Sequence, residues 1–396
     1  MATVYTTQKN QIRGLSGEAF EALREMCRHA KNLYNVGLYN VRQEFFATGL
    51  ALSYETNCKV AKTNENYRHL QAGVSQQILG EVSGAFGSFL ALKRLAERNE
   101  YPAEKVHIPR YLEKNGFYSL VLSTNAITIP FPSRLDPKTV KQVRILPKYD
   151  ARFFEIEFVC TVSQETGEFE PDSALAIDLG LDNLAACIDT NGASFLIDGR
   201  TLKSINHRYN QHNAELQSVK DKQGIESITN QQACITNNRN HRIRDTLNKA
   251  ARYIFNHCLA HGIGTVIVGS NPGWKQEINL GRVTNQNFVQ IPHWQLKRKL
   301  TGLCERYGMR YVEQEEAYSS KASFLDQDPL PEYGAGIKPV FSGKRIARGL
   351  YRSRDGRVVN ADVHGAANIM RKSKQKFNFE RLCTGILAMP LRIRVG

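Results

Sequence analysis

The sequence predicts an α/β core in its C-terminal half, preceded by a small β module that carries a helical insertion. Three observations support this. Apolar residues recur at steps of three and four within 15–99. Short β-branched or aromatic segments alternate with Pro and Gly within 100–172. Strand and helix patterns then alternate through 173–396, which is typical of an α/β fold.

The composition indicates a folded protein with an anionic partner. Of 396 residues, 53 are Lys or Arg and 38 are Asp or Glu, a net charge of +15, while 41% are hydrophobic. That hydrophobic content excludes general disorder. The segment 342–396 alone holds 13 basic and 3 acidic residues, about two thirds of the excess. Nucleic acid is the commonest polyanionic partner of such a chain, although a merely basic, solvated surface remains the alternative.

The eight cysteines are scattered, with no C-x-x-C pair. This pattern argues against a disulfide framework and a zinc ribbon, and favours a reducing compartment. No apolar run approaches the roughly 20 residues that a membrane helix needs. Residues 1–10 also lack the apolar core of a signal peptide. We therefore expect a cytoplasmic protein without a membrane partner.

The first two segments have distinct periods. Residues 15–99 carry two helical stripes, which predict a small bundle: Ala19, Leu23, Met26, Ala30, Leu33 and Tyr34, then Ile78, Val82, Phe86, Phe89, Leu90 and Ala91. Within 100–172, four strand-like segments predict a small barrel or sandwich: 118–122, 126–129, 143–146 and 154–158. Residues 1–13 offer one more strand, which makes the helical segment an insertion into this β module.

The third segment begins with a three-strand meander. Its strands are expected at 175–177, 184–188 and 194–196, with Asn191-Gly192 as the hairpin turn between the last two. A long helix with apolar residues from Ile243 to Cys258, a buried strand at 265–268, a helix at 296–307 stopped by Gly308, and a last strand at 309–312 follow.

Acidic residues follow two of these strands and open a later helix. Asp178 comes directly after an apolar strand, and Asp362 begins a helix rich in small residues. Glu315 and Glu316 lie just past the last predicted strand, where alternation lets only one of them face the sheet edge. Clustered carboxylates are stable chiefly around a hard divalent cation, and a Mg²⁺ pair hydrolyses phosphodiesters. The plainer alternatives are a turn role for Asp178 and a helix N-cap for Asp362.

The residues around these acids resemble the RuvC-type nuclease domain of transposon-encoded TnpB proteins. This resemblance covers 173–374 and rests on three segments: 178–185 (DLGLDNLA), 318–321 (YSSK) and 360–369 (NADVHGAANI). It implies an α/β RNase H-like (RuvC) core with an N-terminal β-barrel wedge module that carries an inserted helical bundle. The implied domains are a wedge module at 1–14 and 100–172, a helical recognition module at 15–99, and a nuclease domain at 173–396 with a basic C-terminal tail.

TnpB proteins are RNA-guided DNA endonucleases related to Fanzor proteins and compact type V CRISPR effectors. The resemblance implies that Asp178, Glu316 and Asp362 hold two Mg²⁺ ions and cleave target DNA. It also implies three properties of the protein in its cell: a guide RNA from the end of the transposable element, a double-stranded target with a short adjacent motif, and a cytoplasmic, nucleoid-associated location in a bacterium.

Two departures from the family pattern matter. Most members place the middle glutamate right after the fourth strand, where this chain has Gly269. A subset of the family and Fanzors carry a glutamate about 45 residues later, so we choose Glu316, with Glu315 second and Glu277 a distant third. No cysteine lies between Glu305 and Leu382. We therefore expect no zinc, with the ribbon tip metal-free or replaced by 322–341.

Basic residues near these motifs are the candidates for nucleic-acid contact: Arg239, Arg242, Arg244, Lys275, Lys321, Lys344, Arg345, Arg348 and Arg352. Two other functions remain open on the sequence. The first is a nuclease-inactive RNA-guided DNA-binding repressor, which Gly269 favours. The second is a guide-free junction resolvase or transposase on the same core.

Overall fold

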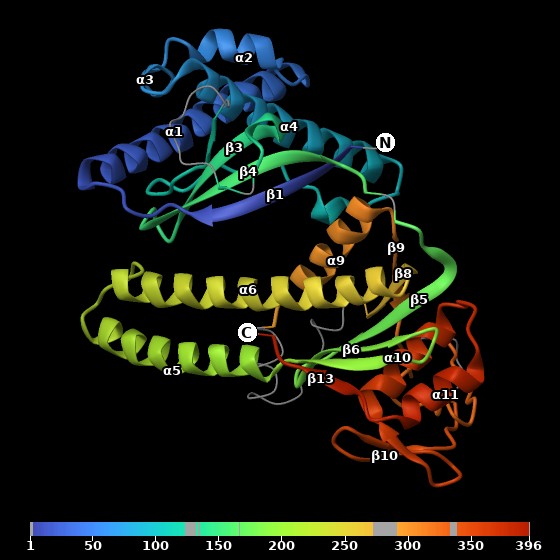
Figure 1. The fold of residues 1–396 in the computed structure, drawn as a ribbon. Coiled ribbons are helices and arrows are strands. Elements are labelled where there is room, and N and C mark those ends of the chain that lie inside the picture. Colours follow the sequence, from blue (N-terminus) through green and yellow to red (C-terminus); the bar gives the residue numbers. More distant parts are fainter. Residues whose placement is uncertain are drawn as a thin grey trace. The chain divides into compact units, whose positions relative to one another are not determined.

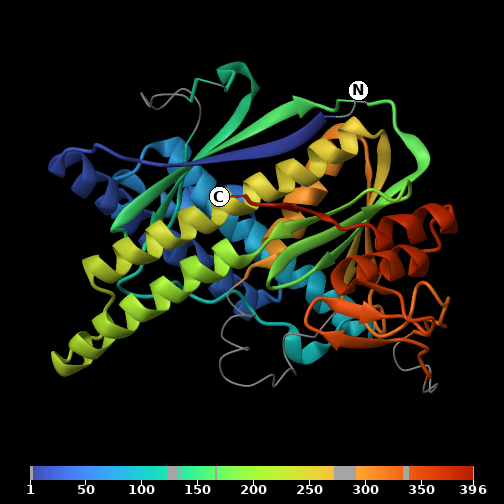
Figure 2. The ribbon, with the colours of Figure 1, turned by 60° about the horizontal axis from the view of Figure 1, so that its bottom comes forward.

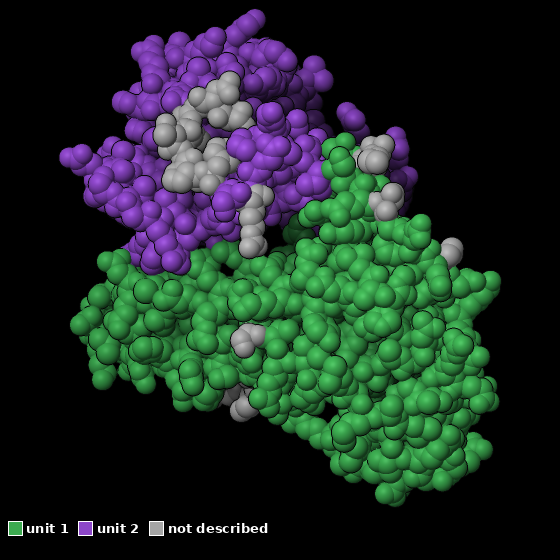
Figure 3. Space-filling view, in the orientation of Figure 1, with its two compact units in different colours: residues 1–4, 163–396 green, residues 5–162 purple. Residues whose placement is uncertain are grey.

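The computed structural model describes residues 3–122, 132–133, 135–165, 167–271, 291–332 and 339–395. The chain divides into two compact units (Figure 3). Unit 1 comprises residues 1–4 and 163–396, and unit 2 comprises residues 5–162. In the described ranges, no helix is long and apolar enough to cross a membrane. The expected strand 126–129 lies outside the described residues.

Unit 2 combines a four-stranded sheet with helices that come between its strands in the sequence. The sheet has the order β1-β4-β3-β2, and β3 pairs antiparallel with both β2 and β4. Its strands are β1 (Thr3–Gln11), β2 (Leu120–Leu122), β3 (Val140–Lys148) and β4 (Phe153–Ser163). Within the described residues the sheet is open, with β1 and β2 at its edges. Closure into a barrel therefore stays a prediction.

The helices of unit 2 follow β1 and precede β2. They are α1 (Gly17–Thr48), α2 (Tyr54–Ala61), α3 (Glu65–Arg68) and α4 (Ala72–Glu97). A short 3₁₀ turn, η1 (Ala103–Lys105), follows α4, and a second one, η2 (Pro137–Thr139), lies between β2 and β3. Ser16 caps the first turn of α1 through its side chain, and Gly49 ends the helix with a φ of 74°. Leu33 and Val82 from the helices share one core with Phe158 from the sheet. Helices and sheet thus bury their apolar faces together.

Unit 1 is built on a six-stranded mixed sheet with the order β13-β7-β6-β5-β8-β9 (Figure 1). Its strands are β5 (Glu170–Leu179), β6 (Asn183–Asp189), β7 (Ser194–Asp198), β8 (Ile263–Ser270), β9 (Arg310–Glu315) and β13 (Leu391–Ile393). The meander β5-β6-β7 turns at Gly192, whose φ is 91°. Strands β8 and β9 run parallel to β5, as the sequence predicts for strand–helix alternation.

Helices cover both faces of this sheet (Figure 2). On one face lie α6 (Asn230–Ala260) and α9 (His293–Tyr307), and on the other lie α10 (Ala361–Lys372) and α11 (Phe379–Leu387). Helix α5 (Arg200–Lys222) runs beside α6 as a long hairpin. Helix α9 ends at Gly308, whose φ of 72° fits the predicted stop.

A three-stranded antiparallel sheet precedes α10. Its strands are β10 (Lys344–Ala347), β11 (Leu350–Arg352) and β12 (Val358–Asn360). Together with α10, α11 and β13, it accounts for most of the basic segment that the sequence predicts as a tail. Much of that charge therefore lies on the surface of folded elements. Ala366 of α10 and Ile386 of α11 lie in one core cluster of the unit, whereas Ile393 of β13 packs against another.

Candidate active site

Asp178 lies near the end of β5, on the face of the sheet that α10 covers. Ala176, two residues earlier on the same face, packs in the core with α10. Asp178 itself is half-buried and pairs with Ala186 of β6. Helix α10 approaches this carboxylate through Gly365, where an added Cβ would lie 2.7 Å from Asp178 Oδ2. Glycine at 365 thus leaves space for the acid.

Glu316 immediately follows β9 and reaches the same face. In the register of β8 and β9, Gly269 pairs with Gln314. Val312 packs against the core between the sheet and α10, and alternation puts Glu316 on that side. A Cβ on Gly269 would meet Glu316 Oε2, so the Glu316 carboxylate occupies the space directly in front of Gly269.

The competing glutamates differ from Glu316. Glu315 is the last residue of β9, whereas the sequence placed it beyond a strand ending at residue 312. It forms an ion pair with Lys372 and accepts a 2.6 Å hydrogen bond from the backbone N–H of Ala317. Its charge is therefore already compensated. Glu277 lies outside the described residues.

Asp362 is the second residue of α10, and its carboxylate points away from the helix cap. The cap is Asn360, whose Oδ1 accepts hydrogen bonds from the N–H groups of Asp362 and Val363 at 3.0 and 3.1 Å. Asp362 Oδ2 accepts a 2.6 Å bond from Asn183 Nδ2. Its Oδ1 lies 2.9 Å from Arg345 Nη2. The N-cap alternative for Asp362 is therefore wrong.

The three acids share one electrostatic environment. Burial raises the pKa of Asp178 well above its usual value, and the negative charges of Glu316 and Asp362 raise it further, while Arg345 opposes them. Burial also raises the pKa of Glu316, with Lys297 acting in the opposite direction. Positions along α10 agree with this. Asp178 lies against Gly365, and a Cβ on Gly269 would meet both Glu316 and Ile369. Asp362 is the second residue of the same helix, so all three acids lie near α10.

The donor atoms of these three acids suit a hard divalent cation. All three are carboxylates, and oxygen ligands are what Mg²⁺ prefers in proteins. Among the described residues, however, no group of three or more His, Cys, Asp or Glu side chains lies so that it could hold a metal ion. The guanidinium of Arg345 pairs with Asp362 and supplies positive charge there. The donor atoms are thus of the type that Mg²⁺ prefers, but these side chains do not form a metal site as they lie.

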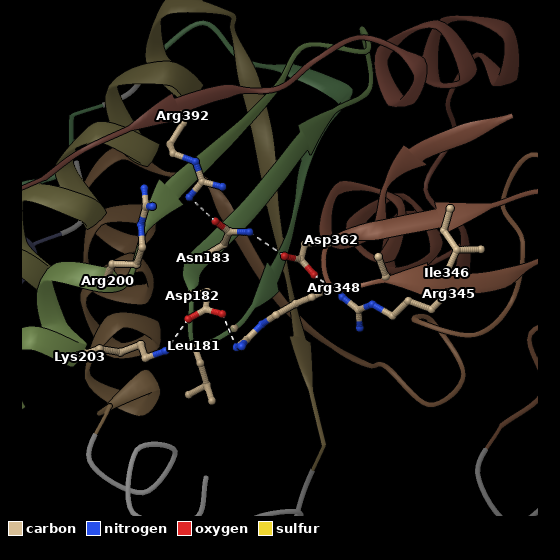
Figure 4. A pocket seen from close by; sticks show the side chains of 13 residues that line it. Leu181, Asp182, Asn183, Arg200, Lys203, Arg345, Ile346, Arg348, Asp362 and Arg392 are labelled. Atoms are coloured by element: carbon tan, nitrogen blue, oxygen red, sulfur yellow. Dashed lines mark hydrogen bonds and ion pairs between the residues drawn. The ribbon is translucent and has the colours of Figure 1, made fainter. Parts of the chain in front are cut away.

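Asp362 also lines a pocket of about 880 Å³ (Figure 4). The pocket contains five basic side chains but only two carboxylates. Its lining is Gly180, Leu181, Asp182, Asn183, Arg200, Lys203, Arg345, Ile346, Ala347, Arg348, Gly349, Asp362 and Arg392. Such a concave basic surface beside an acidic cluster favours an anionic ligand.

Three of these basic residues were missed by sequence reasoning. Arg200 and Lys203 lie three apart at the start of α5, a spacing that places them on one helix face. That spacing was an available signal. The sequence contains no comparable signal for Arg392, because the position of this residue depends on the pairing of β13 with β7. Inside the pocket Asp182 binds Lys203 at 2.6 Å and also pairs with Arg348.

Most of the predicted nucleic-acid contacts lie on or near the small sheet β10-β11-β12. The basic side chains of that sheet are exposed: Lys344, Arg345, Arg348 and Arg352. Lys321 is also exposed, in the turn after β9. Lys275 lies outside the described residues.

The arginines of α6 are only partly available to a ligand. Arg239 is half-buried and donates to Asn206 Oδ1 of α5 at 2.9 Å, while its guanidinium lies 5.3 Å from the ring centre of Tyr209. Arg244 is half-buried as well, and Arg242 is exposed. Arg239 thus helps to hold the α5–α6 hairpin together, and the expectation that all three arginines face a phosphate backbone stays a prediction.

Comparison with known proteins shows what the chain is similar to. Residues 157–275 match the family model OrfB_IS605, described as a probable transposase. The chain is 21% identical to the TnpB-like protein ORF457 of Acidianus two-tailed virus, over 93% of this chain and 87% of that protein. The chain is thus similar to TnpB proteins. The family model spans Asp178 and ends before Glu316 and Asp362.

A solved structure has a similar fold. It is a Cas12f1–sgRNA–target DNA complex, similar at a TM-score of 0.55 and 14% identity, covering 89% of this chain and 83% of that one. The chain therefore shares the α/β nuclease fold of that Cas12f1 protein.

Proposed function

We propose that this TnpB-like chain is an RNA-guided DNA endonuclease of a transposable element. One observation supports the proposal: Asp362 lines a pocket with five basic side chains, and Asp178 and Glu316 lie near α10, the helix that carries Asp362. Acidic residues suit divalent cations, and basic residues suit a phosphate backbone. A nuclease needs both, next to each other.

Each group has a role in this proposal. Asp178, Glu316 and Asp362 would hold two Mg²⁺ ions, which would supply an activated water and stabilise the departing oxygen. Arg200, Lys203 and Arg348 bind phosphates of the strand and orient it along the pocket. Arg345 pairs with Asp362 in this structure, and phosphate is a competing partner for its guanidinium.

The nucleic-acid partners are inferred from the likeness to TnpB proteins and from the basic charge of the pocket. The solved Cas12f1 relative is a complex with guide RNA and target DNA. We propose the same partners here, with a guide from the element's own end and a short motif beside the target. In this proposal the sheet of unit 2 acts as the wedge module and α1–α4 as the recognition module. The complex would be cytoplasmic and nucleoid-associated in its host.

The test is Mg²⁺-dependent cleavage by the purified protein–RNA complex. We expect Asp178→Asn and Asp362→Asn to lower cleavage by on the order of 10³-fold or more while RNA-guided binding persists. Asp172→Asn is the matched control, because Asp172 is exposed and lies before the site on the same strand. Cleavage retained by Asp178→Asn would refute the catalytic assignment.

A second candidate is the nuclease-inactive repressor. It is favoured by two findings. Among the described residues, no group of three His, Cys, Asp or Glu side chains could hold a metal ion, and Asp362 already makes an ion pair with Arg345. The same assay separates the candidates. Wild-type complex that binds target DNA but never cuts it supports the repressor, and cleavage without guide RNA supports a resolvase or transposase.

A further inference from the structure

The C-terminal strand β13 contributes a side chain to the candidate active site. It pairs parallel with β7 at the edge of the large sheet, and Arg392 lies opposite Leu196. Arg392 lines the pocket that contains Asp362 (Figure 4). A segment at the far end of the sequence thus reaches the same pocket as the first strands of the unit.

Arg392 and Asp362 are joined through Asn183, the first residue of β6 (Figure 4). Arg392 Nη1 donates to Asn183 Oδ1 at 2.8 Å, and Asn183 Nδ2 donates to Asp362 Oδ2 at 2.6 Å. Asn183 is only 8% exposed. Its amide is therefore held between a group that only donates and a carboxylate that only accepts.

This chain of contacts permits only one amide orientation. A guanidinium has no acceptor, so it selects the oxygen of Asn183 and leaves the NH₂ group for Asp362. If the amide turned over, its oxygen would face a carboxylate and its NH₂ group a cation. Arg392 therefore sets which end of Asn183 meets Asp362, and the bond from Asn183 leaves Oδ1 of Asp362 directed towards Arg345.

We propose that Asn183 is a positioning residue for Asp362, that Arg392 acts through Asn183, and that β13 is thereby part of the nuclease site. This inference rests on the proposed function, since it assigns these residues to the carboxylate that would bind the cations. Residues that orient a ligand in this way usually change metal affinity more than they change folding.

Arg392 can be changed without removing the strand. Val395 and Ile393 pack against the core of unit 1 and anchor the C-terminal segment. Arg394 is also exposed, lies two residues after Arg392 and does not line the pocket. Arg394→Ala therefore removes the same charge from the same segment, and it is the matched control for Arg392→Ala.

The experiment compares Asn183→Ala, Arg392→Ala, their double variant and Arg394→Ala. The first measurement is the Mg²⁺ concentration that gives half-maximal single-turnover cleavage by the complex. We expect it to rise on the order of 10-fold in Asn183→Ala, and less in Arg392→Ala. The double variant should match Asn183→Ala, because Arg392 acts through Asn183 and the effects are then not additive. Arg394→Ala should equal the wild type.

The second measurement does not depend on cleavage. It is the rise in melting temperature that Mn²⁺ causes in the protein without nucleic acid. We expect this rise to be smaller in Asn183→Ala and Arg392→Ala than in Arg394→Ala. Equal shifts in Arg392→Ala and Arg394→Ala would overturn the inference, as would additive effects in the double variant. If the wild type does not cut DNA but the Mn²⁺ shifts follow this pattern, the proposed function fails and the positioning role stands.

Discussion

The side chain of Glu316 occupies the space that a side chain at position 269 would need. Any Cβ at position 269 would meet Glu316 Oε2, and it would also lie 2.7 Å from Ile369 Cδ1. A glutamate side chain projecting from β8 at 269 and one projecting from 316 therefore exclude each other. The residue type at one position limits the residue type at the other.

This relationship predicts that a glutamate at position 269 can restore the cleavage lost when Glu316 is removed. Glu316→Ala should lower cleavage by on the order of 10³-fold, because it removes one of three clustered carboxylates. Adding Gly269→Glu to that variant should restore measurable cleavage, since the new side chain enters the space that Glu316 left. Glu313→Ala serves as the control, because Glu313 pairs with Lys297 at the surface. Glu316→Ala cutting DNA at the wild-type rate would contradict the assignment.

Gly269→Glu alone should instead destabilise the protein. Two side chains then share one space, and overpacking of this kind costs about 1–3 kcal/mol of unfolding free energy. The measurement is denaturant unfolding of Gly269→Glu with and without Glu316→Ala. If the second substitution does not relieve the loss, the two side chains do not share this space.

The clustered acids predict a stabilising substitution in metal-free protein. The raised pKa of Asp178 means that the folded state binds its proton more tightly than the unfolded state, so ionised Asp178 lowers stability at neutral pH. With chelator present, Asp178→Asn should raise the melting temperature by about 2–4 °C per kcal/mol of relieved repulsion. Its advantage should shrink as the pH falls and wild-type Asp178 gains its proton. An advantage that grows on acidification would contradict this.

Arg345 predicts opposite effects on cation and nucleic-acid binding. Its side chain is 47% exposed and pairs with Asp362. Arg345→Ala should increase the rise in melting temperature caused by Mg²⁺, because the carboxylate loses its competing partner. It should also weaken RNA-guided DNA binding and reduce the salt slope of that binding by about 1. Arg352→Ala, on the neighbouring strand β11, is the control, and it should leave the Mg²⁺ effect unchanged.

Asp328 predicts a local stability defect that does not involve the three acids of the candidate site. Burial opposes its ionisation, but hydrogen bonds from Ser342 and from the backbone N–H of Ser323 outweigh burial and lower its pKa. Asp328→Ala leaves these donors without a partner and should cost about 1–3 kcal/mol of unfolding free energy. Because the pKa of Asp328 is lowered, this contribution is present above about pH 4 and is lost as the pH falls further. Denaturant unfolding of both proteins at pH 7 and pH 3 tests it.

The elements that depend on local sequence were predictable. The helix that ends at Gly308 and the hairpin turn at Gly192 both require a positive φ, for which glycine is the usual residue. Apolar periodicity likewise predicted α6, although nothing in that pattern indicated that Arg239 donates to Asn206 of α5. A side chain's partner on another helix depends on packing, which periodicity does not describe.

The non-local parts of the site were not predictable. Strand β13 has only three residues, and its hydrogen bonds come from β7, almost two hundred positions earlier. The contact between Asn183 and Asp362 likewise joins residues 179 positions apart. The sequence suggested that the acids converge, through the resemblance to TnpB proteins, but the basic pocket beside them arises only when β10, α5 and β13 come together.

The separation of Asn183 and Arg392 has a consequence for synthesis on the ribosome. Arg392 is translated 209 positions after Asn183, so the amide of Asn183 emerges well before the guanidinium that selects its orientation. A chain interrupted between these two residues would lack this hydrogen bond, and its Asn183 amide could adopt either orientation.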